Sequence, residues 1–72
     1  MIKLADFVKQ RRKEANLTQA AFAERAGVAL TVIRKIEQGK ENLNFEKVNQ
    51  VLKMFGHILA PVNARELVTS KQ

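Results

Sequence analysis

The sequence predicts an all-α domain of four short helices, followed by one short C-terminal β-strand. Apolar residues recur at helical spacing in four segments, and glycine or asparagine stands between these segments. The 72 residues are enough for one domain and no more. Within residues 17–39, two of the helical segments flank a tight turn at Ala26-Gly27-Val28, so this part of the chain is expected to form a helix-turn-helix.

The first helix is expected over residues 3–15. Four of its residues share one helical face, at positions i, i+3, i+4 and i+7: Leu4, Phe7, Val8 and Arg11. Asn16 is expected to end the helix, because asparagine tolerates the left-handed conformation that closes helices. Because Arg11 shares the inner face, its alkyl stem is expected to follow the core while its charge stays in water.

The second helix is expected to begin at Gln19 and to end at residue 25 or 26. Thr18 caps it in this prediction, since its hydroxyl can accept a backbone N–H from the first turn. The inward face allows another helix to approach closely because it includes two alanines: Phe22, Ala23 and Ala26. Gly27 follows at the position where a positive φ closes the helix.

The third helix is expected over residues 30–37, with Ile33 and Ile36 facing inward and Gly39 closing the end. After a short polar connection, Asn44 is expected to cap a fourth helix over residues 45–55. One apolar stripe runs along this fourth helix: Phe45, Val48, Leu52 and Phe55. Gly56 stops it.

The segment after Gly56 is short, apolar and bounded by glycine and asparagine, and this pattern predicts a strand over residues 57–62. Ile58, Ala60 and Val62 would point to one side of an extended chain, and Pro61 restricts the strand to a sheet edge. A lone strand is not stable, so the simplest partner is the same strand of a second copy. Residues 63–72 fit either a short helix or a frayed tail.

These boundaries divide the chain into a helix-turn-helix domain, residues 1–56, and a dimerisation segment, residues 57–72. Dimerisation is also favoured because a core this small is marginal by itself, and no cysteine is present to staple it. The expected dimer interface comes from the end of the fourth helix and from the strand: Phe55, His57, Ile58, Leu59, Ala60 and Val62.

The charge balance favours a polyanionic partner. Lysine and arginine number 13 against 7 acidic residues, and the net charge is +6. No apolar run approaches the roughly 20 residues of a membrane span, and the charged N-terminal segment lacks a signal-peptide core. A cytoplasmic location without membrane contact is therefore expected. The absence of cysteine suits that compartment.

Little in the sequence supports an enzyme. The only histidine, His57, stands at a helix end beside apolar residues, and a structural role explains it best. Glu37 and Glu41 are four residues apart, which is typical of a solvated helix face. No phosphate-binding loop, metal-ligand spacing or nucleophile–base set is visible. We therefore expect no catalytic residues, no cofactor and no metal.

The helix-turn-helix predicts DNA contacts, because the second helix of such a motif enters the major groove. Its outward positions here are Leu30, Thr31, Arg34 and Lys35. Thr31 can hydrogen-bond a base, Leu30 can touch a thymine methyl, and the two basic residues can donate to guanine or phosphate. Phosphate contacts are expected from three further residues: Thr18, Gln19 and Lys40. An ordinary solvated face is the alternative, and the helix–glycine–helix frame favours DNA.

At these residues, the chain resembles the Cro/phage-repressor (Xre) class of helix-turn-helix proteins, which have a lambda-repressor-like fold. The resemblance covers residues 4–56, with the matching strings Arg11-Arg12-Lys13, Leu17-Thr18-Gln19, Phe22-Ala23, Ala26-Gly27-Val28, Ile33 and Ile36-Glu37-Gln38-Gly39-Lys40. It implies that Gln19 binds a phosphate and that Leu30, Thr31 and Lys35 read bases. It also implies a structural ion pair between Arg12 and Glu37.

A narrower resemblance is to HipB-like antitoxins, carried by residues 47–52, Phe55-Gly56-His57 and the short strand that follows. It implies a repressor that autoregulates its toxin–antitoxin operon and holds a HipA-type kinase toxin. Two residues depart from the usual pattern. Ala29 replaces the Ser or Thr that caps the third helix, which loses about 1 kcal/mol, and Leu30 occupies a usually polar base-reading position.

Taken together, the sequence predicts a non-catalytic, sequence-specific transcriptional repressor that binds palindromic double-stranded DNA as a homodimer. Two alternatives stay open: a phage-type repressor without a toxin partner, and a protein-interaction module that uses the helix-turn-helix as a scaffold. A membrane-surface amphipathic peptide ranks last, because the first helix is too short for that role.

Overall fold

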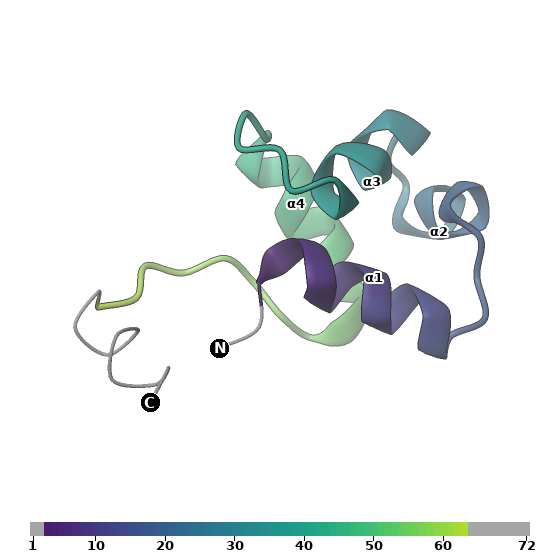
Figure 1. Ribbon diagram of the computed structural model, residues 1–72, viewed down its shortest axis with the longest axis horizontal. Helices are drawn as coiled ribbons and strands as arrows, with labels where there is room; N and C mark the ends of the chain where they lie inside the picture. The colour runs from purple at the N-terminus through teal and green to yellow at the C-terminus, as the bar shows by residue number, and fades with distance from the viewer. Residues whose placement is uncertain (1–2, 64–72) are drawn as a thin grey trace.

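The computed structural model describes residues 3–63. These residues form four α-helices and one short 3-10 helix (Figure 1): α1 (Leu4–Glu14), α2 (Gln19–Ala26), α3 (Leu30–Glu37), α4 (Phe45–Leu52) and η1 (Lys53–Phe55). The prediction of an all-α fold with four helices is confirmed. None of the described helices combines the length and the apolarity required to cross a membrane. The expectation for residues 64–72 lies outside the described residues.

Two of the helices begin at side-chain caps, as predicted. The hydroxyl of Thr18 accepts a hydrogen bond from the Ala21 N–H at 3.1 Å, and Asn44 Oδ1 accepts one from the Lys47 N–H at 3.1 Å. Each bond satisfies an N–H that has no partner inside its own helix. By contrast, α3 follows Ala29, which offers no side-chain acceptor.

The turn between α2 and α3 is closed by Gly27. This residue has a φ of 73°, in the left-handed region where a Cβ would be strained. Its N–H donates to the Glu24 carbonyl at 3.2 Å, and the Val28 N–H donates to the Ala23 carbonyl at 3.0 Å. These two bonds form the Schellman arrangement that commonly ends helices. Asn16, predicted to end α1, has a positive φ of 58°.

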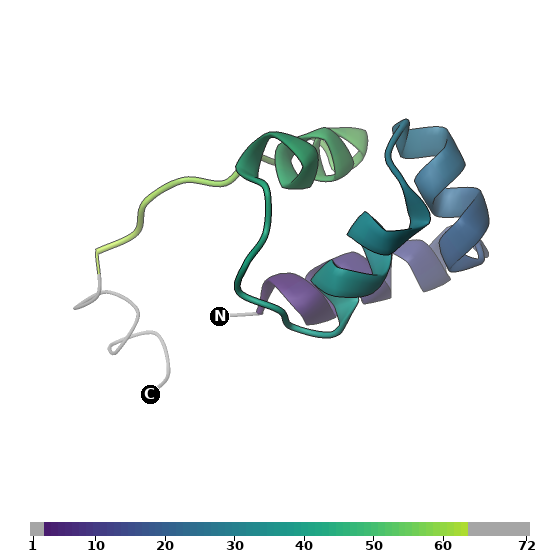
Figure 2. The ribbon, with the colours of Figure 1, turned by 90° about the horizontal axis from the view of Figure 1, so that it is seen from above.

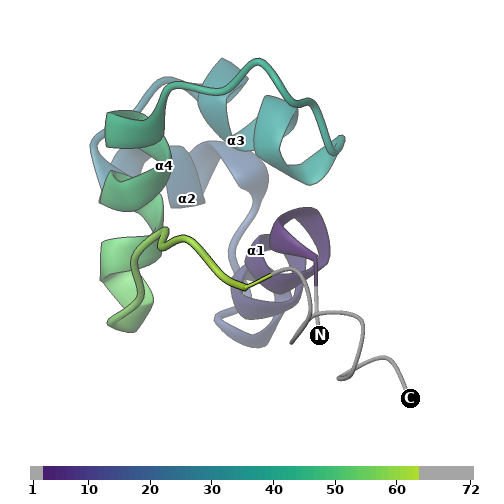
Figure 3. The same ribbon diagram turned by 90° about the vertical axis from the view of Figure 1, so that its left-hand side faces the viewer.

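The helices enclose one apolar core to which each of α1, α2, α3 and α4 contributes. Figures 1 and 2 show α2 and α3 as adjacent, angled helices, with the chain leaving the helical body on the side away from α2. Seen from that side, α1, α3 and α4 surround a common centre (Figure 3). Nine buried residues fill it: Val8, Phe22, Ala23, Ala26, Ile33, Ile36, Val48, Val51 and Leu52.

The fourth helix differs from its prediction in two respects. It ends as an α-helix at Leu52 and tightens into η1 before Gly56, rather than continuing to Phe55. Phe45 was predicted on the inward stripe, and its side chain is 76% exposed. Phe45 is the first residue of α4 and lies outside the core, whereas Leu43, before the helix, packs against the core and Val51, near the end of the helix, is fully buried.

Residues 57–63 follow the helical body as irregular chain. The His57 N–H donates to the Leu52 carbonyl at 3.1 Å, and the Leu59 N–H donates to Asn49 Oδ1 at 2.7 Å, so the start of this tail (residues 57–63) is held against α4. No β-strand occurs among residues 3–63. The predicted strand was expected to pair with a second copy, which a single chain does not supply, so this pairing stays a prediction.

Candidate nucleic-acid interface

One face of α3 carries exposed polar and basic side chains. Thr31, Arg34 and Lys35 are all exposed, and their i, i+3, i+4 spacing places them on the same side of the helix. On the opposite side, Ile33 and Ile36 are buried in the core. The helix therefore presents a continuous surface that can contact a ligand while its opposite side stays packed in the core.

Leu30 lies differently from the other three residues predicted to read bases. It is half-buried, and its side chain packs against the core. Only part of this side chain is available for contact with a ligand, and that contact is apolar. Leu30 thus contributes both to the packing of the core and to any contact that α3 makes with a ligand.

Lys47 of α4 lies close to the same face, although sequence reasoning did not select it. One hollow beside α3 is lined by residues of α3, of the loop after it and of α4: Thr31, Val32, Lys35, Asn42, Leu43, Asn44, Lys47 and Val48. The hollow thereby brings a second lysine next to Thr31 and Lys35. The sequence did offer a signal: Lys47 is a basic residue in the first turn of α4, three residues after the Asn44 cap, where the helix dipole does not favour an ammonium group.

Arg12 and Glu37 are in direct contact, with Arg12 Nε 2.7 Å from Glu37 Oε2 and Nη2 3.1 Å from Oε1. A third guanidinium nitrogen, Nη1, donates to the Leu17 carbonyl at 2.9 Å. The Glu37 side chain is only 3% exposed. This bidentate pair ties α1 to the end of α3, the helix that bears the exposed face.

The pair shifts the pKa of both groups. Burial by itself raises the pKa of the Glu37 carboxyl, but the hydrogen bonds from Arg12 and Gln19 outweigh burial and the pKa lies below its ordinary value. The hydrogen bond to Glu37 raises the pKa of Arg12 despite the opposing effect of burial. Both groups are therefore held in their charged forms.

Gln19 also joins this pair, which the sequence did not predict. Its Nε2 donates to Glu37 Oε1 at 3.1 Å. An amide nitrogen carries two hydrogens, so the half-buried Gln19 keeps one donor for another ligand. Thr18 and Lys40 are exposed, and the Lys40 N–H donates to the Lys35 carbonyl at 3.1 Å, directly after α3.

The residues predicted to form a dimer interface fall into two groups. Phe55 and Leu59 are half-buried and pack against the core. Phe55 lies 5.7 Å from the Phe22 ring and 6.2 Å from the Phe7 ring, between centroids. The others are exposed: His57, Ile58, Ala60 and Val62. The first group holds the start of the tail on the body. In the second group, the exposed His57 ring still lies 4.8 Å from the Phe7 ring, between centroids.

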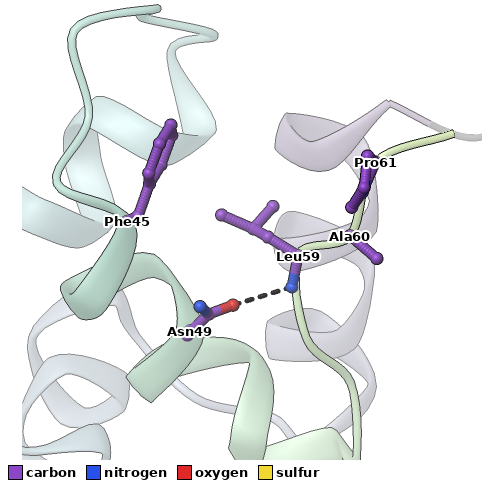
Figure 4. Close-up of a pocket in the computed structure, with 5 residues that line it drawn as sticks. All are labelled: Phe45, Asn49, Leu59, Ala60 and Pro61. Carbon is purple, nitrogen blue, oxygen red and sulfur yellow. Dashed lines mark hydrogen bonds between the residues drawn. The ribbon is translucent and has the colours of Figure 1, made fainter.

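Beside the tail lies an apolar hollow (Figure 4), lined by Phe45, Asn49, Leu59, Ala60 and Pro61. The exposed Phe45 forms one wall, and the tail forms the other.

Arg11, expected to lie along the core, places its guanidinium 5.4 Å from the centre of the Phe7 ring and 5.9 Å from that of Phe55.

Two angled helices joined by a glycine turn, with an exposed basic face on the second helix, define a helix-turn-helix DNA-binding domain. The comparison with protein families agrees: the helix-turn-helix family HTH_3 matches residues 8–58, and the chain belongs to this family. No curated protein matches the chain.

Proposed function

We propose that this protein is a sequence-specific transcriptional repressor whose α3 helix reads bases in the major groove of DNA. The exposed face formed by Thr31, Arg34 and Lys35 is the observation that carries the proposal. Membership of the helix-turn-helix family and the net charge of +6 support it. In this proposal, repression follows from covering a promoter, and the protein acts in the cytoplasm.

The contacts divide into two kinds in this proposal. Thr31, Arg34 and Lys35 contact base edges, and the exposed part of Leu30 contacts a thymine methyl. Phosphates are held by Thr18 and Gln19 at the start of α2 and by Lys40 after α3, and these contacts carry no sequence information themselves. The second N–H of the Gln19 amide is the donor that remains for a phosphate once Glu37 has taken the first.

The functional unit in this proposal is a homodimer on a palindromic site. The exposed Ile58 and Val62 and the apolar hollow beside Phe45 support an interface formed by the tail and α4. Two copies of the tail pair as strands across the two-fold axis, together with Phe55, His57, Leu59 and Ala60. The two α3 helices then lie about one DNA turn apart, roughly 34 Å.

As a finer proposal, the chain is a HipB-like antitoxin that represses its own operon and holds a HipA-type kinase toxin. The resemblance of residues 47–52 and of Phe55-Gly56-His57 supports this role. Co-purification of the tagged chain from its host tests it. A kinase bound to the chain supports the antitoxin role, whereas DNA without any protein partner points to a phage-type repressor.

The main proposal is tested by selecting duplexes from a randomised DNA library with the purified full-length chain. We expect enrichment of one palindromic sequence with half-sites about 10 base pairs apart, centre to centre. Enrichment of a single, unpaired half-site would contradict the dimer. No enrichment at all would contradict sequence-specific recognition, and would favour a protein-interaction module.

A further inference from the structure

Gln50, in the last turn of α4, makes two hydrogen bonds that have not been described above. Its Nε2 donates to the Ala26 carbonyl at 2.9 Å and to the Gly27 carbonyl at 3.0 Å. These carbonyls belong to the last residue of α2 and to the turn that leads into α3. A single side chain of α4 thus binds the joint of the helix-turn-helix.

The two bonds add to the hydrogen bonding at the end of α2. The last carbonyls of a helix have no partner within it. The Schellman turn satisfies the carbonyls of Ala23 and Glu24, through the N–H groups of Val28 and Gly27. Gln50 donates to the carbonyl of Ala26, the last residue of α2, and to that of Gly27 in the turn. Because an amide nitrogen has two hydrogens, one Gln50 side chain supplies both donors.

Gln50 is itself held firmly. Its neighbours on α4, Val48, Val51 and Leu52, are buried in the core. A Cβ placed on Gly27 would lie 3.0 Å from Gln50 Nε2, so the bare glycine leaves the space that the amide occupies. The amide is therefore a fixed support beside the turn, rather than a mobile surface group.

Because Gln50 binds the turn that leads into α3, it can affect the orientation of α3. The Gly27 carbonyl precedes the start of α3 by three residues, and α3 has eight residues, which make it about 12 Å long. Apolar packing holds α3 on the body but is non-directional, and the Arg12–Glu37 pair fixes the far end of the helix. With that end fixed, a rotation of about 10° would move the start of α3 by about 2 Å, which is more than a base contact tolerates. The hydrogen bonds of Gln50 to the turn oppose this movement.

We propose that Gln50 is a positioning residue for DNA recognition: by donating to the Ala26 and Gly27 carbonyls, it sets the angle at which α3 meets the base edges. The expected effect on DNA binding rests on the proposed function. The orientation of α3 relative to α2 is a property of the protein by itself, and it can be measured without any DNA.

The test compares the wild-type chain with Gln50→Met and Gln50→Glu. Methionine keeps the length and removes both donors, and glutamate keeps the shape but sets a carboxylate against two carbonyl oxygens. Asn49→Asp is the matched control for charge, because it adds the same negative charge one residue away and keeps the oxygen that accepts from Leu59. Gln50→Asn, which keeps the amide on a shorter stem, serves as the milder variant if Gln50→Met does not fold.

The first readout is the angle between α2 and α3 in the DNA-free protein, from residual dipolar couplings. We expect the angle to change in the Gln50 variants and to stay at the wild-type value in Asn49→Asp. We also expect the Gln50 side-chain N–H groups of the wild-type chain to exchange with solvent more slowly than those of Gln38, an exposed glutamine. An unchanged angle, or equal exchange rates, would overturn the positioning role.

The second readout is selectivity, measured as the ratio of affinities for the duplex that the wild-type chain selects and for a scrambled duplex of equal length. We expect Gln50→Met to lower this ratio about tenfold, on the scale of one lost base contact, with affinity for the scrambled duplex unchanged. A changed angle with an unchanged ratio would overturn the role in recognition. Failure of the wild-type chain to select any duplex would refute the proposed function and this consequence of it, while the couplings still decide whether Gln50 positions α3.

Discussion

At the scale of single residues, side chains on the exposed face of α3 and side chains beside that face are proposed to make different contacts with DNA. Lys35 lies on the face that is proposed to read bases, and Lys40 lies just past the end of the same helix. The two residues carry equal charge, so their difference in role is a matter of position. This makes them a matched pair for experiment.

Replacing Lys35 with alanine should change base preference, and replacing Lys40 with alanine should not. Loss of a base contact costs about 1–3 kcal/mol at one position of the site, whereas loss of a phosphate contact weakens binding on all sequences alike. Binding titrations against single-base variants of the selected duplex measure both effects. A Lys35→Ala variant with unchanged affinity and preference would show that Lys35 does not contact DNA.

The Arg12–Glu37 pair makes stability depend on pH on the acid side. The folded-state pKa of Glu37 lies below its ordinary value of 4.5. A carboxyl of this kind stabilises the fold fully above its unfolded-state pKa, and the contribution is lost as pH falls through the lower, folded-state pKa. Stability should therefore decline as the pH is lowered from about 4.5.

Glu37→Gln should lower the free energy of unfolding at pH 7 by about 1–3 kcal/mol, because charge-assisted hydrogen bonds are lost. It should also flatten the decline at acid pH. Urea unfolding at pH 7 and pH 3 measures both, with Glu41→Gln, at an exposed glutamate, as the control. Equal pH dependence in the wild type and in Glu37→Gln would show that the pair does not carry this effect.

At the scale of helices and turns, side-chain caps and a closing glycine determine where several helices begin and end. Thr18 and Asn44 accept backbone N–H groups where α2 and α4 start, and Gly27 closes α2 at a positive φ. α3 lacks such a cap, since Ala29 precedes it. The helix proposed to read DNA thus starts with less intrinsic stability than its neighbours.

Ala29→Ser should stabilise the protein by about 1 kcal/mol, because a serine hydroxyl supplies the missing cap. For a domain of this size, such a gain raises Tm by about 4–8 °C. Thr18→Ala should lower the stability by a similar amount, since it removes an existing cap. Thermal unfolding followed by circular dichroism measures both variants. No gain in Tm for Ala29→Ser would show that the first turn of α3 is stabilised in another way.

Caps and closing glycines could be predicted because they depend on a few neighbouring residues. The sequence therefore located α2 and α3 to within a residue. Phe45 could not be placed by its helical periodicity, since a first-turn residue is buried only if another element covers it, and no element among residues 3–63 covers this one. The hydrogen bond from Gln19 to Glu37 and the two bonds of Gln50 also join distant segments, which local patterns do not encode.

At the scale of the whole molecule, the basic net charge and the position of the tail both matter. The net charge of +6 favours attraction to any DNA. The tail leaves the helical body on the side away from α2 (Figure 1), with Ile58 73% and Val62 47% exposed. Apolar side chains in this place are consistent with the proposed pairing of two copies.

Deleting residues 57–72 should convert the proposed dimer into a monomer, because the exposed apolar side chains of the tail are lost with it. Sedimentation or light scattering gives the mass in solution, and a folded truncated chain is verified by circular dichroism. Ile58→Asp, which leaves the helical body intact, should weaken association in the same direction. A truncated chain that remains a dimer would exclude the tail as the interface.

The most direct test of the DNA-binding account is a salt-dependent titration of the full chain with the selected duplex and with the scrambled duplex. We expect the selected duplex to bind at least about 1,000-fold more tightly. Both affinities should fall steeply with rising salt, because lysine and arginine contacts release counterions from the phosphates. Equal affinity for the two duplexes, or binding that does not respond to salt, would contradict recognition through α3 and its basic flanks.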